Sequence, residues 1–474
     1  MTPVPGLVAG RRRAALVVLC FVQFMLILDD TVVSVALPSL REDLGFGGPG
    51  PAWVVNAYFL AFGGLLLPAG RAADLLGRRR VFLAGVALFG LASLACGLAQ
   101  QPWQLVAGRF VQGAGAAMAG PAALSLITLL FPGTGERARA LGIWGAVAAL
   151  GGTTGLLISG VLTGLVSWRW IFLINLPVAA VALALVPRLV AESRAARRAR
   201  LNLPGALLGT AAVVSLVYGL LQAGASGWAD AAVIGPLVLA AVLAAGFVLA
   251  ESRAAEPLVP MSFLADRTRA VANGATLLFS VAMYAMAFLL MIHLQTVLGY
   301  GPLQAGLAYL PYGAGILLGM RLSARMMTRI GVRWTLVLSF LISSAGLLLL
   351  SGVAAGDSYG LGVLPGMLVT SLGCGLTLPV LAVAALTGAT GEDAGLGSAL
   401  FSSVQQIGGA VGVAALVTVA AGALRTAQEG FSLALTVAAA LVVLGAVLIA
   451  ALLRTGRPAA ASDSAAHRTP ARQG

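Results

Sequence analysis

Two adjacent carboxylates, Asp29 and Asp30, lie inside an apolar run that extends from Ala14 to Leu37. They are the only acidic residues well inside a hydrophobic stretch, since the others fall in connections, at the ends of stretches or in the C-terminal tail. One basic residue, Arg109, has the same setting in a later apolar run. A charge held among apolar residues is costly, so two acids and a base kept there predict a site that binds or transfers ions.

The composition indicates that these residues lie in a membrane. The 474-residue chain is 59% hydrophobic and 9% charged, which leaves too little polar surface for a soluble globular protein. Apolar stretches of roughly 18 to 25 residues recur along it, long enough to cross about 30 Å of hydrocarbon. We count about fourteen, beginning near residues 14, 52, 80, 103, 138, 168, 203, 231, 271, 303, 334, 360, 399 and 430. Their continuity excludes a transmembrane β-barrel and predicts an all-α polytopic membrane protein.

The basic residues, 29 in number and all arginine, set the orientation. If the N-terminus is cytoplasmic, Arg41, Arg169 and Arg425 are external, Arg109 is intramembrane, and the remaining arginines are cytoplasmic, in accord with the positive-inside rule. Both termini are then cytoplasmic. The net charge of +13 could also indicate a nucleic-acid partner, but the arginines are dispersed over loops and form no basic domain. We therefore expect no nucleic acid, and attribute the charge to topology and to contact with the lipid bilayer.

Several classes of function are disfavoured by what the sequence contains. It has no nucleophile–base pair, no metal-ligand cluster and no phosphate-binding Gly-Lys-Ser/Thr loop, so we predict that the protein is not an enzyme and needs neither metal nor cofactor. Frequent Ala, Gly and Arg without lysine suggest a GC-rich bacterial coding sequence, and hence a bacterial plasma (inner) membrane. A monomer is the expected oligomeric state.

A recurring connection divides the chain. The hexapeptide Gly133-Thr134-Gly135-Glu136-Arg137-Ala138, before the fifth stretch, recurs as Ala389-Thr390-Gly391-Glu392-Asp393-Ala394 before the thirteenth. This shift of eight stretches pairs the first six with the last six and leaves two extra ones between them. We expect a cytoplasmic N-terminus at 1–13, a six-helix bundle at 14–187, a linker with two extra helices at 188–270, a second bundle at 271–453 and a disordered cytoplasmic tail at 454–474. Two related bundles that rock about a central site are typical of secondary transporters.

The intramembrane charges are expected to meet at one depth. At about 1.5 Å per residue, Asp29 lies roughly 8 Å from the outer edge of its span and Arg109 roughly 9 Å from the outer edge of its own. Adjacent helical residues point about 100° apart, so Asp29 and Asp30 cannot both face one partner. We predict that one acid pairs with Arg109 and the other faces the substrate path, and the sequence leaves open which. Such an acid can carry a proton, because burial favours its neutral form and Arg109 its ionised form. The alternative is a fixed ion pair that only positions helices.

Characteristic motifs are spread from the first stretch to the thirteenth. They are Leu28-Asp29-Asp30-Thr31-Val32-Val33-Ser34-Val35-Ala36-Leu37-Pro38, Gly70-x-x-x-Asp74-x-x-Gly77-Arg78-Arg79-Arg80, Arg109-x-x-Gln112-Gly113-x-Gly115, Trp168-Arg169-Trp170-Ile171-Phe172-Leu173-Ile174-Asn175-Leu176-Pro177, Gln295-Thr296-Val297-Leu298-Gly299-Tyr300 and Gln405-Gln406-Ile407-Gly408-Gly409. In order and spacing they resemble the major facilitator superfamily, and within it the fourteen-helix drug:proton antiporter (multidrug efflux) family. The resemblance implies the major facilitator fold, with two six-helix bundles and two extra central helices.

The same resemblance implies a function. A protein of this family would be a proton-coupled efflux transporter that exports small amphipathic or cationic organic compounds, such as antibiotics, by alternating access, with Asp29, Asp30 and Arg109 in proton coupling. The fifth-helix antiporter signature usually carries Gly-Pro and then Gly-Gly, whereas this chain has Gly155-Leu156-Leu157-Ile158-Ser159-Gly160. A proton-coupled symporter or uniporter for a small metabolite therefore stays open. The alternative of another class is a non-transporting membrane receptor or scaffold. The identity of the small-molecule substrate is not readable from the sequence.

The loop between the second and third stretches predicts a conformational latch. Its glycines, Gly70 and Gly77, allow a tight turn, and Asp74 and Arg78 could form an ion pair that breaks as the bundles rock. The alternative is a solvated basic loop that serves topology alone, which is the role expected of its remaining arginines, Arg71, Arg79 and Arg80.

Polar residues within the stretches are candidates for lining the substrate cavity. They are Gln23, Asn56, Tyr58, Gln112, Trp144, Tyr284, His293, Gln295, Tyr309, Gln405 and Gln406. His293 is the only histidine within a stretch, and its titration range also suits a proton relay. Each of these side chains could instead hydrogen-bond a neighbouring helix. Four glycines are expected to serve helix packing or bending, namely Gly113, Gly115, Gly151 and Gly155.

Overall fold

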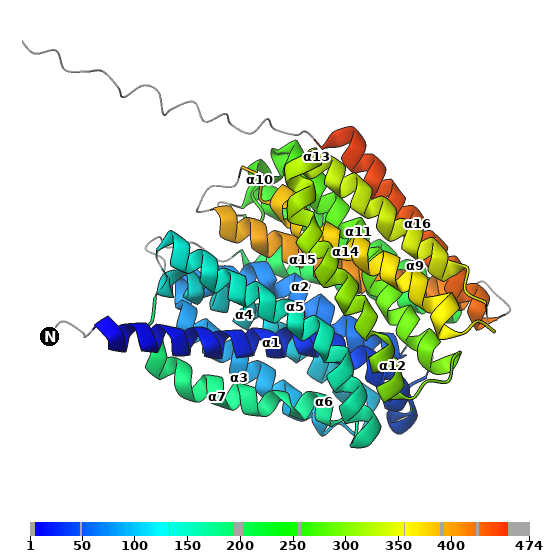
Figure 1. The fold of residues 1–474 in the computed structure, drawn as a ribbon, viewed down its shortest axis with the longest axis horizontal. Coiled ribbons are helices and arrows are strands. Elements are labelled where there is room, and N and C mark those ends of the chain that lie inside the picture. Colours follow the sequence, from blue (N-terminus) through cyan, green and yellow to red (C-terminus); the bar gives the residue numbers. More distant parts are fainter. Residues whose placement is uncertain are drawn as a thin grey trace, which may run out of the picture.

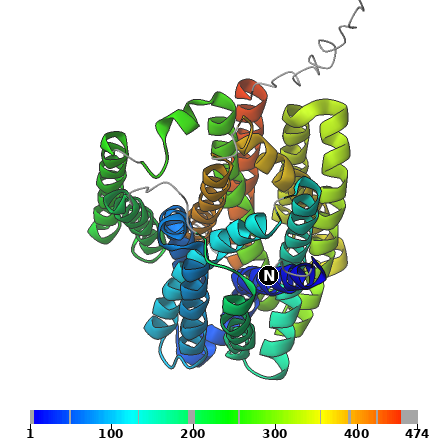
Figure 2. The same cartoon turned by 90° about the vertical axis from the view of Figure 1, so that its left-hand side faces the viewer.

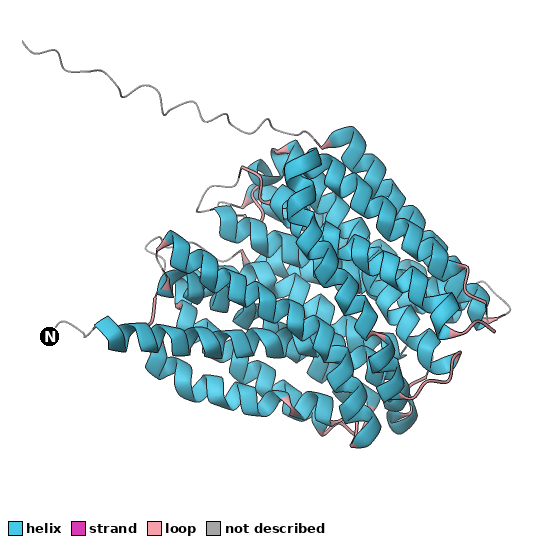
Figure 3. Ribbon diagram, in the orientation of Figure 1, coloured by secondary structure: helices cyan, strands magenta, loops and turns pink. Residues whose placement is uncertain are grey.

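The computed structural model describes residues 5–47, 50–131, 133–193, 202–254, 257–354, 356–388, 393–422 and 426–453, and every regular element in these ranges is a helix (Figures 1 and 3). Arg425, the tail at 454–474 and most of the second copy of the recurring hexapeptide lie outside the described residues. Helices are the expected solution for spans in lipid, because each one satisfies its backbone hydrogen bonds internally.

The elements follow in chain order. They are α1 (Pro5–Leu44), α2 (Gly50–Leu76), α3 (Arg78–Gly97), α4 (Pro102–Leu130), α5 (Thr134–Leu165), α6 (Trp170–Leu173), α7 (Asn175–Leu189), α8 (Leu203–Ser226), α9 (Ala231–Arg253), α10 (Met261–Ala265), α11 (Arg267–Thr296), α12 (Pro302–Ala308), α13 (Leu310–Ser351), a π-helical turn (Tyr359–Val363), α14 (Leu364–Ala385), α15 (Asp393–Gly422) and α16 (Ala427–Leu452).

Thirteen helical segments of the described residues are long and apolar enough to cross a membrane, one fewer than the fourteen stretches expected. The difference lies in the segment Pro302–Ser351, which has 50 residues. Its backbone leaves the helical conformation at Gly331, where φ is 78° and ψ is 167°. Gly319 and Ser343 both lie against the same part of α14, between Leu372 and Leu376. In a straight helix these two residues, 24 positions apart, would be separated by about 36 Å. The segment therefore folds back at Gly331 and supplies two spans.

The early helices pack closely through small residues. Gly85 of α3 and Gly115 of α4 face each other, because a Cβ placed on either would lie 2.8 Å from the carbonyl oxygen of the other. A Cβ on Gly113 would lie 2.5 Å from the Tyr58 carbonyl oxygen of α2. Such close approach of backbones is the usual basis of helix association in lipid. It brings α1, α2, α3, α4 and α7 around a common core (Figure 1).

Helices from the two halves of the sequence meet along two seams. On one side the C-terminal part of α5 meets α12, where a Cβ on Gly160 would lie 2.7 Å from the Pro302 carbonyl oxygen. On the other side α2 meets α15, where a Cβ on Gly63 would lie 3.0 Å from Cβ of Gln406. We refer to the second contact as the α2–α15 seam. The two ends of the molecule are called the Arg78 end and the Trp168 end below, after the residues that lie there.

The helices α8 and α9 stand at the edge of the molecule (Figure 2). Helix α8 packs against α2 and α15, whereas the main partner of α9 is α8. The Tyr218 ring of α8 lies 6.0 Å from the Trp53 ring of α2, and the Thr418 hydroxyl of α15 donates a hydrogen bond of 2.6 Å to the Leu220 carbonyl oxygen of α8. Helix α8 therefore covers the α2–α15 seam from outside.

Candidate functional site

Asp29 of α1 is fully buried and receives hydrogen bonds from three side chains. Its Oδ2 accepts from Nη1 of Arg109, and its Oδ1 accepts from Nε2 of Gln112 at 3.1 Å and from Nδ2 of Asn175 at 3.0 Å. Arg109 and Gln112 stand one turn apart on α4, and Asn175 begins α7. The carboxylate is thus fixed by donors from two other helices, as a charge in a low-dielectric interior requires.

The Arg109 guanidinium is also fully buried. Its Nε donates to the Val54 carbonyl oxygen at 3.0 Å, and Nη1 donates to Oε1 of Gln112 at 3.0 Å. Its Cζ lies 4.3 Å from the centre of the Tyr58 ring and 5.9 Å from that of Phe172. Two aromatic faces and several acceptors replace the water that this cation would otherwise hold.

Two members of this network were not among the residues singled out in the sequence. Asn175 bonds Asp29, and the Ser93 hydroxyl oxygen of α3 accepts from Nε2 of Gln112 at 2.7 Å. Asn175 belongs to the motif at 168–177, where an amide in an otherwise apolar run is a signal that could have identified it. Ser93 lies in a stretch rich in small residues and gives no such signal.

Asp30 differs from its neighbour in burial and partners. It keeps some exposed surface, and its Oδ1 is buried without a hydrogen-bond partner. Its neighbours include Gln406 of α15 and Arg109. Tyr284 of α11 also lies close, and its hydroxyl donates to Oε1 of Gln406 at 3.2 Å. Asp29 is therefore the acid held by Arg109, and Asp30 is the acid that faces helices of the other half of the chain.

The other cavity candidates fall into different settings. Asn56 is buried with neither amide atom hydrogen-bonded, and Gln295 donates from Nε2 to the Val35 carbonyl oxygen of α1 at 2.9 Å. Tyr309 is buried and donates to the Ala287 carbonyl oxygen at 3.0 Å. Gln23, Trp144 and Gln405 are partly buried, and Gln406, not Gln405, contacts Tyr284.

His293 of α11 lies apart from the acids. It is nine residues further along α11 than Tyr284, or about 13 Å. Its ring stacks on Phe431 of α16, with centres 4.5 Å apart, and neither ring nitrogen has a hydrogen-bond partner. This arrangement is packing between two helices, and the proton-relay role of His293 stays a prediction.

The loop at the Arg78 end is an ordered structure. Nη2 of Arg78 lies 2.8 Å from Oδ1 of Asp74. Gly77 has a φ of 115°, a conformation that favours glycine. Gly70 lies within α2, with open space where a Cβ would stand, so the turn is at Gly77 and the role expected of Gly70 in it is wrong. Beside them Glu192, which the sequence did not indicate, accepts from the backbone N–H of Arg79 at 3.1 Å and of Arg80 at 3.2 Å.

The expectation that the remaining arginines of this loop are merely solvated is wrong for Arg71 and Arg79, whereas the Arg80 side chain is 65% exposed. Arg79 and Arg80 each form an ion pair with Glu192, at 3.8 and 3.7 Å. Nη2 of Arg71 donates to the Pro257 carbonyl oxygen at 2.9 Å. The loop is thus tied to the segments that follow α7 and α9. Glu192 lies at the start of α3, where its negative charge also complements the positive end of that helix.

The glycines expected to serve packing meet neighbouring helices. Gly113 approaches α2 and Gly115 approaches α3, as described above. In α5, a Cβ on Gly151 would lie 3.2 Å from Cβ of Ile27, and one on Gly155 would overlap the Thr31 hydroxyl. Helix α5 therefore lies closely against α1 at Ile27 and Thr31, directly on either side of Asp29 and Asp30.

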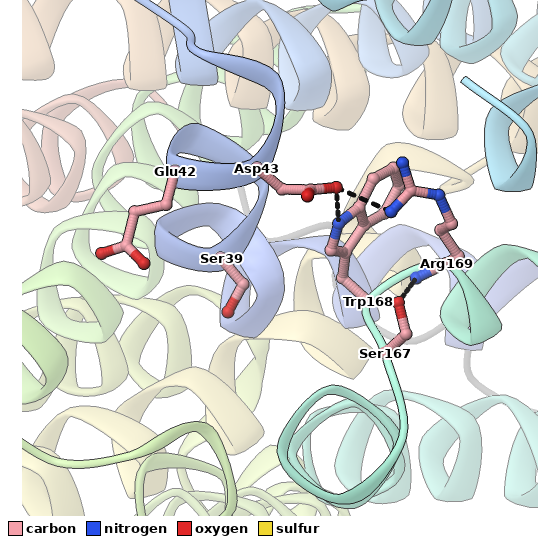
Figure 4. Close-up of a pocket in the computed structure, with 6 residues that line it drawn as sticks. All are labelled: Ser39, Glu42, Asp43, Ser167, Trp168 and Arg169. Atoms are coloured by element: carbon pink, nitrogen blue, oxygen red, sulfur yellow. Dashed lines mark hydrogen bonds and ion pairs between the residues drawn. The ribbon is translucent and has the colours of Figure 1, made fainter. Parts of the chain in front are cut away.

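A hollow of about 430 Å³ lies at the Trp168 end, between the end of α1 and the connection from α5 to α6 (Figure 4). Asp43 lines it and accepts from Nε1 of Trp168 at 2.9 Å and from Nη1 of Arg169 at 2.6 Å. It is 14 residues from Asp29 along α1, about 21 Å. The hollow is therefore separate from the buried acids.

Comparison with known proteins agrees with this geometry. The family model described as Major Facilitator Superfamily matches residues 19–413 and 274–472. The chain is 38% identical to the puromycin resistance protein pur8 of Streptomyces alboniger, over 98% of this chain and 95% of that one. It is 40% identical to the cephamycin export protein CmcT of Amycolatopsis lactamdurans, over 85% of this chain and 84% of that one.

A solved structure shows the same fold. The human organic anion transporter MFSD10 (TETRAN) superposes with a TM-score of 0.62 at 18% identity, covering 92% of this chain and 99% of that one. At this identity the likeness concerns the fold alone. With the motifs, the helices and the family match in agreement, the chain belongs to the major facilitator superfamily and is a multi-pass membrane transporter, not an enzyme.

Proposed function

We propose that the protein exports small amphipathic or cationic organic compounds, antibiotics among them, in exchange for protons. The names of its relatives support export of antibiotics, since one is a puromycin resistance protein and another a cephamycin export protein. We further propose that it acts as a monomer in the bacterial plasma membrane with both termini in the cytoplasm, an orientation supported by the distribution of its arginines.

The observation that carries the coupling mechanism is the contrast between the two acids. Asp29 and Arg109 form a buried ion pair within a hydrogen-bonded network, so their charges already compensate each other. Asp30 has an oxygen without a partner and supplies the remaining negative charge of the trio. One proton or one cationic group bound at Asp30 would neutralise the site. Proton and substrate therefore compete for Asp30, and competition for one charge is sufficient for exchange.

Alternating access follows from where Asp30 lies. In this proposal the bundle at 14–187 and the bundle at 271–453 rock against each other, and the linker at 188–270 follows them. Asp30 belongs to the first bundle and touches Gln406 of the second, so a change in its charge alters a contact between bundles. The pair Asp74 and Arg78 acts as a latch at the cytoplasmic end. One charge moved through about 100 mV supplies about 2.3 kcal/mol for this cycle.

The test is proton movement evoked by substrate. Purified protein in proteoliposomes with an imposed pH gradient is given puromycin, a cephamycin and a panel of cationic and neutral drugs while internal pH is recorded. Substrate should drive protons in the opposite direction, and Asp30→Asn should abolish this. Asp230→Asn, which removes an exposed carboxylate at the start of α9, is the control and should leave exchange intact. Substrate flux without proton movement would contradict antiport and indicate uniport. Proton movement in the same direction as the substrate would indicate symport.

A further inference from the structure

Glu251 is a buried acid outside the coupling site. It lies at the C-terminal end of α9 with 2% of its surface exposed. Both carboxylate oxygens are used, since Oε1 accepts from Nδ2 of Asn202 at 2.6 Å and Oε2 accepts from the Val259 backbone N–H at 3.0 Å. A buried carboxylate destabilises the fold unless its contacts compensate for lost hydration. In Glu251 the contacts with Asn202 and Val259 provide this compensation.

Asn202 connects this acid to the start of α8. Its Oδ1 accepts from the Gly205 backbone N–H at 3.1 Å and so caps the helix, while its amide donates to Glu251. A Cβ on Gly205 would overlap Oε1 of Glu251, so only glycine leaves room for the carboxylate. Glu251 therefore joins the first turn of α8 and the last turn of α9 to the chain segment that follows.

That segment, residues 257–263, lies across the α2–α15 seam at the Arg78 end. Leu258, Val259 and Phe263 are buried, and they pack with Leu400 of α15 and with Leu67 of α2. The Pro257 carbonyl oxygen accepts from Arg71 of α2. The segment thus touches helices from both halves of the chain at the end where Asp74 and Arg78 are also found.

We propose that Glu251 is a positioning residue that holds the segment 257–263 as a cover over the α2–α15 seam at the Arg78 end. The linker pair α8–α9 is then part of the gate at this end, because the seam can open only when the segment lifts from Leu400. The inference rests on the proposed function in one respect, since it takes the opening of this seam to be a step of transport. The hydrogen bonds to Val259 and Asn202 set how often the segment lifts.

A cysteine under the cover reports its opening. Leu400→Cys puts a thiol on a position that is 8% exposed and packed against the segment. The three native cysteines are all buried, and labelling of the parent protein gives the background. The full-length protein in proteoliposomes is treated with a membrane-impermeant maleimide from the side where the Arg78 end is accessible, with no substrate and no pH gradient.

Four variants separate the cover from general damage. Glu251→Ala removes both acceptors. Asn202→Asp keeps the helix cap of α8, because Asp caps as well as Asn, but it sets a second carboxylate against Glu251. Glu251→Gln keeps one acceptor and turns the other into a donor that faces an N–H. Asp230→Asn removes a carboxylate charge at the opposite end of α9, keeps its cap and touches no part of the segment.

We expect Asn202→Asp and Glu251→Ala to raise the labelling rate at position 400 about tenfold, and Glu251→Gln to raise it less. Asp230→Asn should leave it unchanged, and all variants should elute as the parent does in size-exclusion chromatography. In transport, the first two should change the half-saturating substrate concentration on the Arg78 side more than the maximal rate. Unchanged labelling in Asn202→Asp, or an equal rise in Asp230→Asn, would overturn the proposal. Labelling needs neither drug nor a pH gradient. The test of the cover and the test of antiport can therefore fail independently of each other.

Discussion

Asp29 and Asp30 are adjacent on α1, yet Asp29 accepts hydrogen bonds from three side chains while Oδ1 of Asp30 accepts none. The 100° turn between neighbouring helical residues produces this difference. One side chain points into the helices α4 and α7, and the other points towards α11 and α15. Substitutions at the two positions should therefore have different consequences.

Asp29→Asn should chiefly destabilise the fold. It leaves the Arg109 cation buried without its counter-ion, and breaking a buried pair in this way costs about 3–5 kcal/mol. Unfolding of the detergent-solubilised protein, followed by circular dichroism against temperature, would measure the effect. Asp30→Asn is the matched control and should unfold within a few degrees of the parent. Equal loss of stability in both variants would contradict the division of roles.

Adding Arg109→Gln to Asp29→Asn should recover part of the loss. The double variant has no buried charge left unpaired, and replacing a buried ion pair by neutral groups is much less costly than removing one partner. The interaction energy from the four proteins of this double-mutant cycle is the quantity to measure. An additive result would mean that the two residues do not stabilise each other.

Asn175→Leu should weaken the same network without changing its charge. The amide donates to Asp29 at 3.0 Å, and loss of a buried donor to a charged group costs about 1–3 kcal/mol. Asn175→Asp should be worse, because it places a second carboxylate against Oδ1 of Asp29. If Asn175→Asp unfolds at a higher temperature than Asn175→Leu, the contact with Asp29 does not contribute to stability.

Gly77→Ala should destabilise the loop at the Arg78 end. The φ of 115° disfavours any residue with a Cβ, and the new methyl group would meet the Glu192 carboxylate at 2.7 Å, so we expect a cost of at least about 1–2 kcal/mol. Gly70→Ala is the control within the same loop motif. It lies inside a helix with open space around it and should be neutral or stabilising by up to about 1 kcal/mol.

Asp74→Asn should affect transport more than stability. Its ion pair with Arg78 is partly exposed, at 43% and 22% of the two side chains, and such pairs contribute about 0–1 kcal/mol. If the pair is a latch, its loss should change the maximal transport rate severalfold at nearly constant unfolding temperature. A transport rate equal to that of the parent would leave the pair a part of the loop alone.

The proposed coupling through one net charge predicts a dependence on membrane potential. A singly charged cation exchanged for one proton moves no net charge, so its export should not respond to an imposed potential. Export of a neutral drug against one proton should respond by about 2.3 kcal/mol of driving force per 100 mV. Flux in proteoliposomes with valinomycin-set potentials would measure this. A voltage effect on monovalent cation export would require a second coupled proton.

Much of the fold could be predicted because the membrane limits the choices. Each of the fourteen apolar stretches corresponds to a span, including the two on either side of Gly331. The pairing of an acid with Arg109 was also accessible, since both residues lie at similar depth. In contrast, the choice of Asp29 over Asp30 depends on the rotation of α1, which apolar residues all around the helix do not specify.

Residues that act through their neighbours were the hardest to predict. Glu192 and Glu251 lie at helix ends, where an acid is usually solvated, and only the packing of α7 and α9 brings them against backbone N–H groups. Gln295, a candidate for lining the cavity, also joins α11 to α1. Such contacts depend on how the spans pack against one another, and the sequence pattern within a single span does not predict this packing.

The position of α8 against both α2 and α15 has a mechanical consequence. A helix that is attached to two moving bodies resists their separation at the points of attachment, which here are Trp53 and Thr418. We expect α8 to act as the pivot, with the smallest displacement at these two residues and a larger one at the Arg78 end, where the segment 257–263 covers the seam. The extra helix pair would then fix the direction in which the transporter swings, while the coupling site at Asp30 determines when it does so.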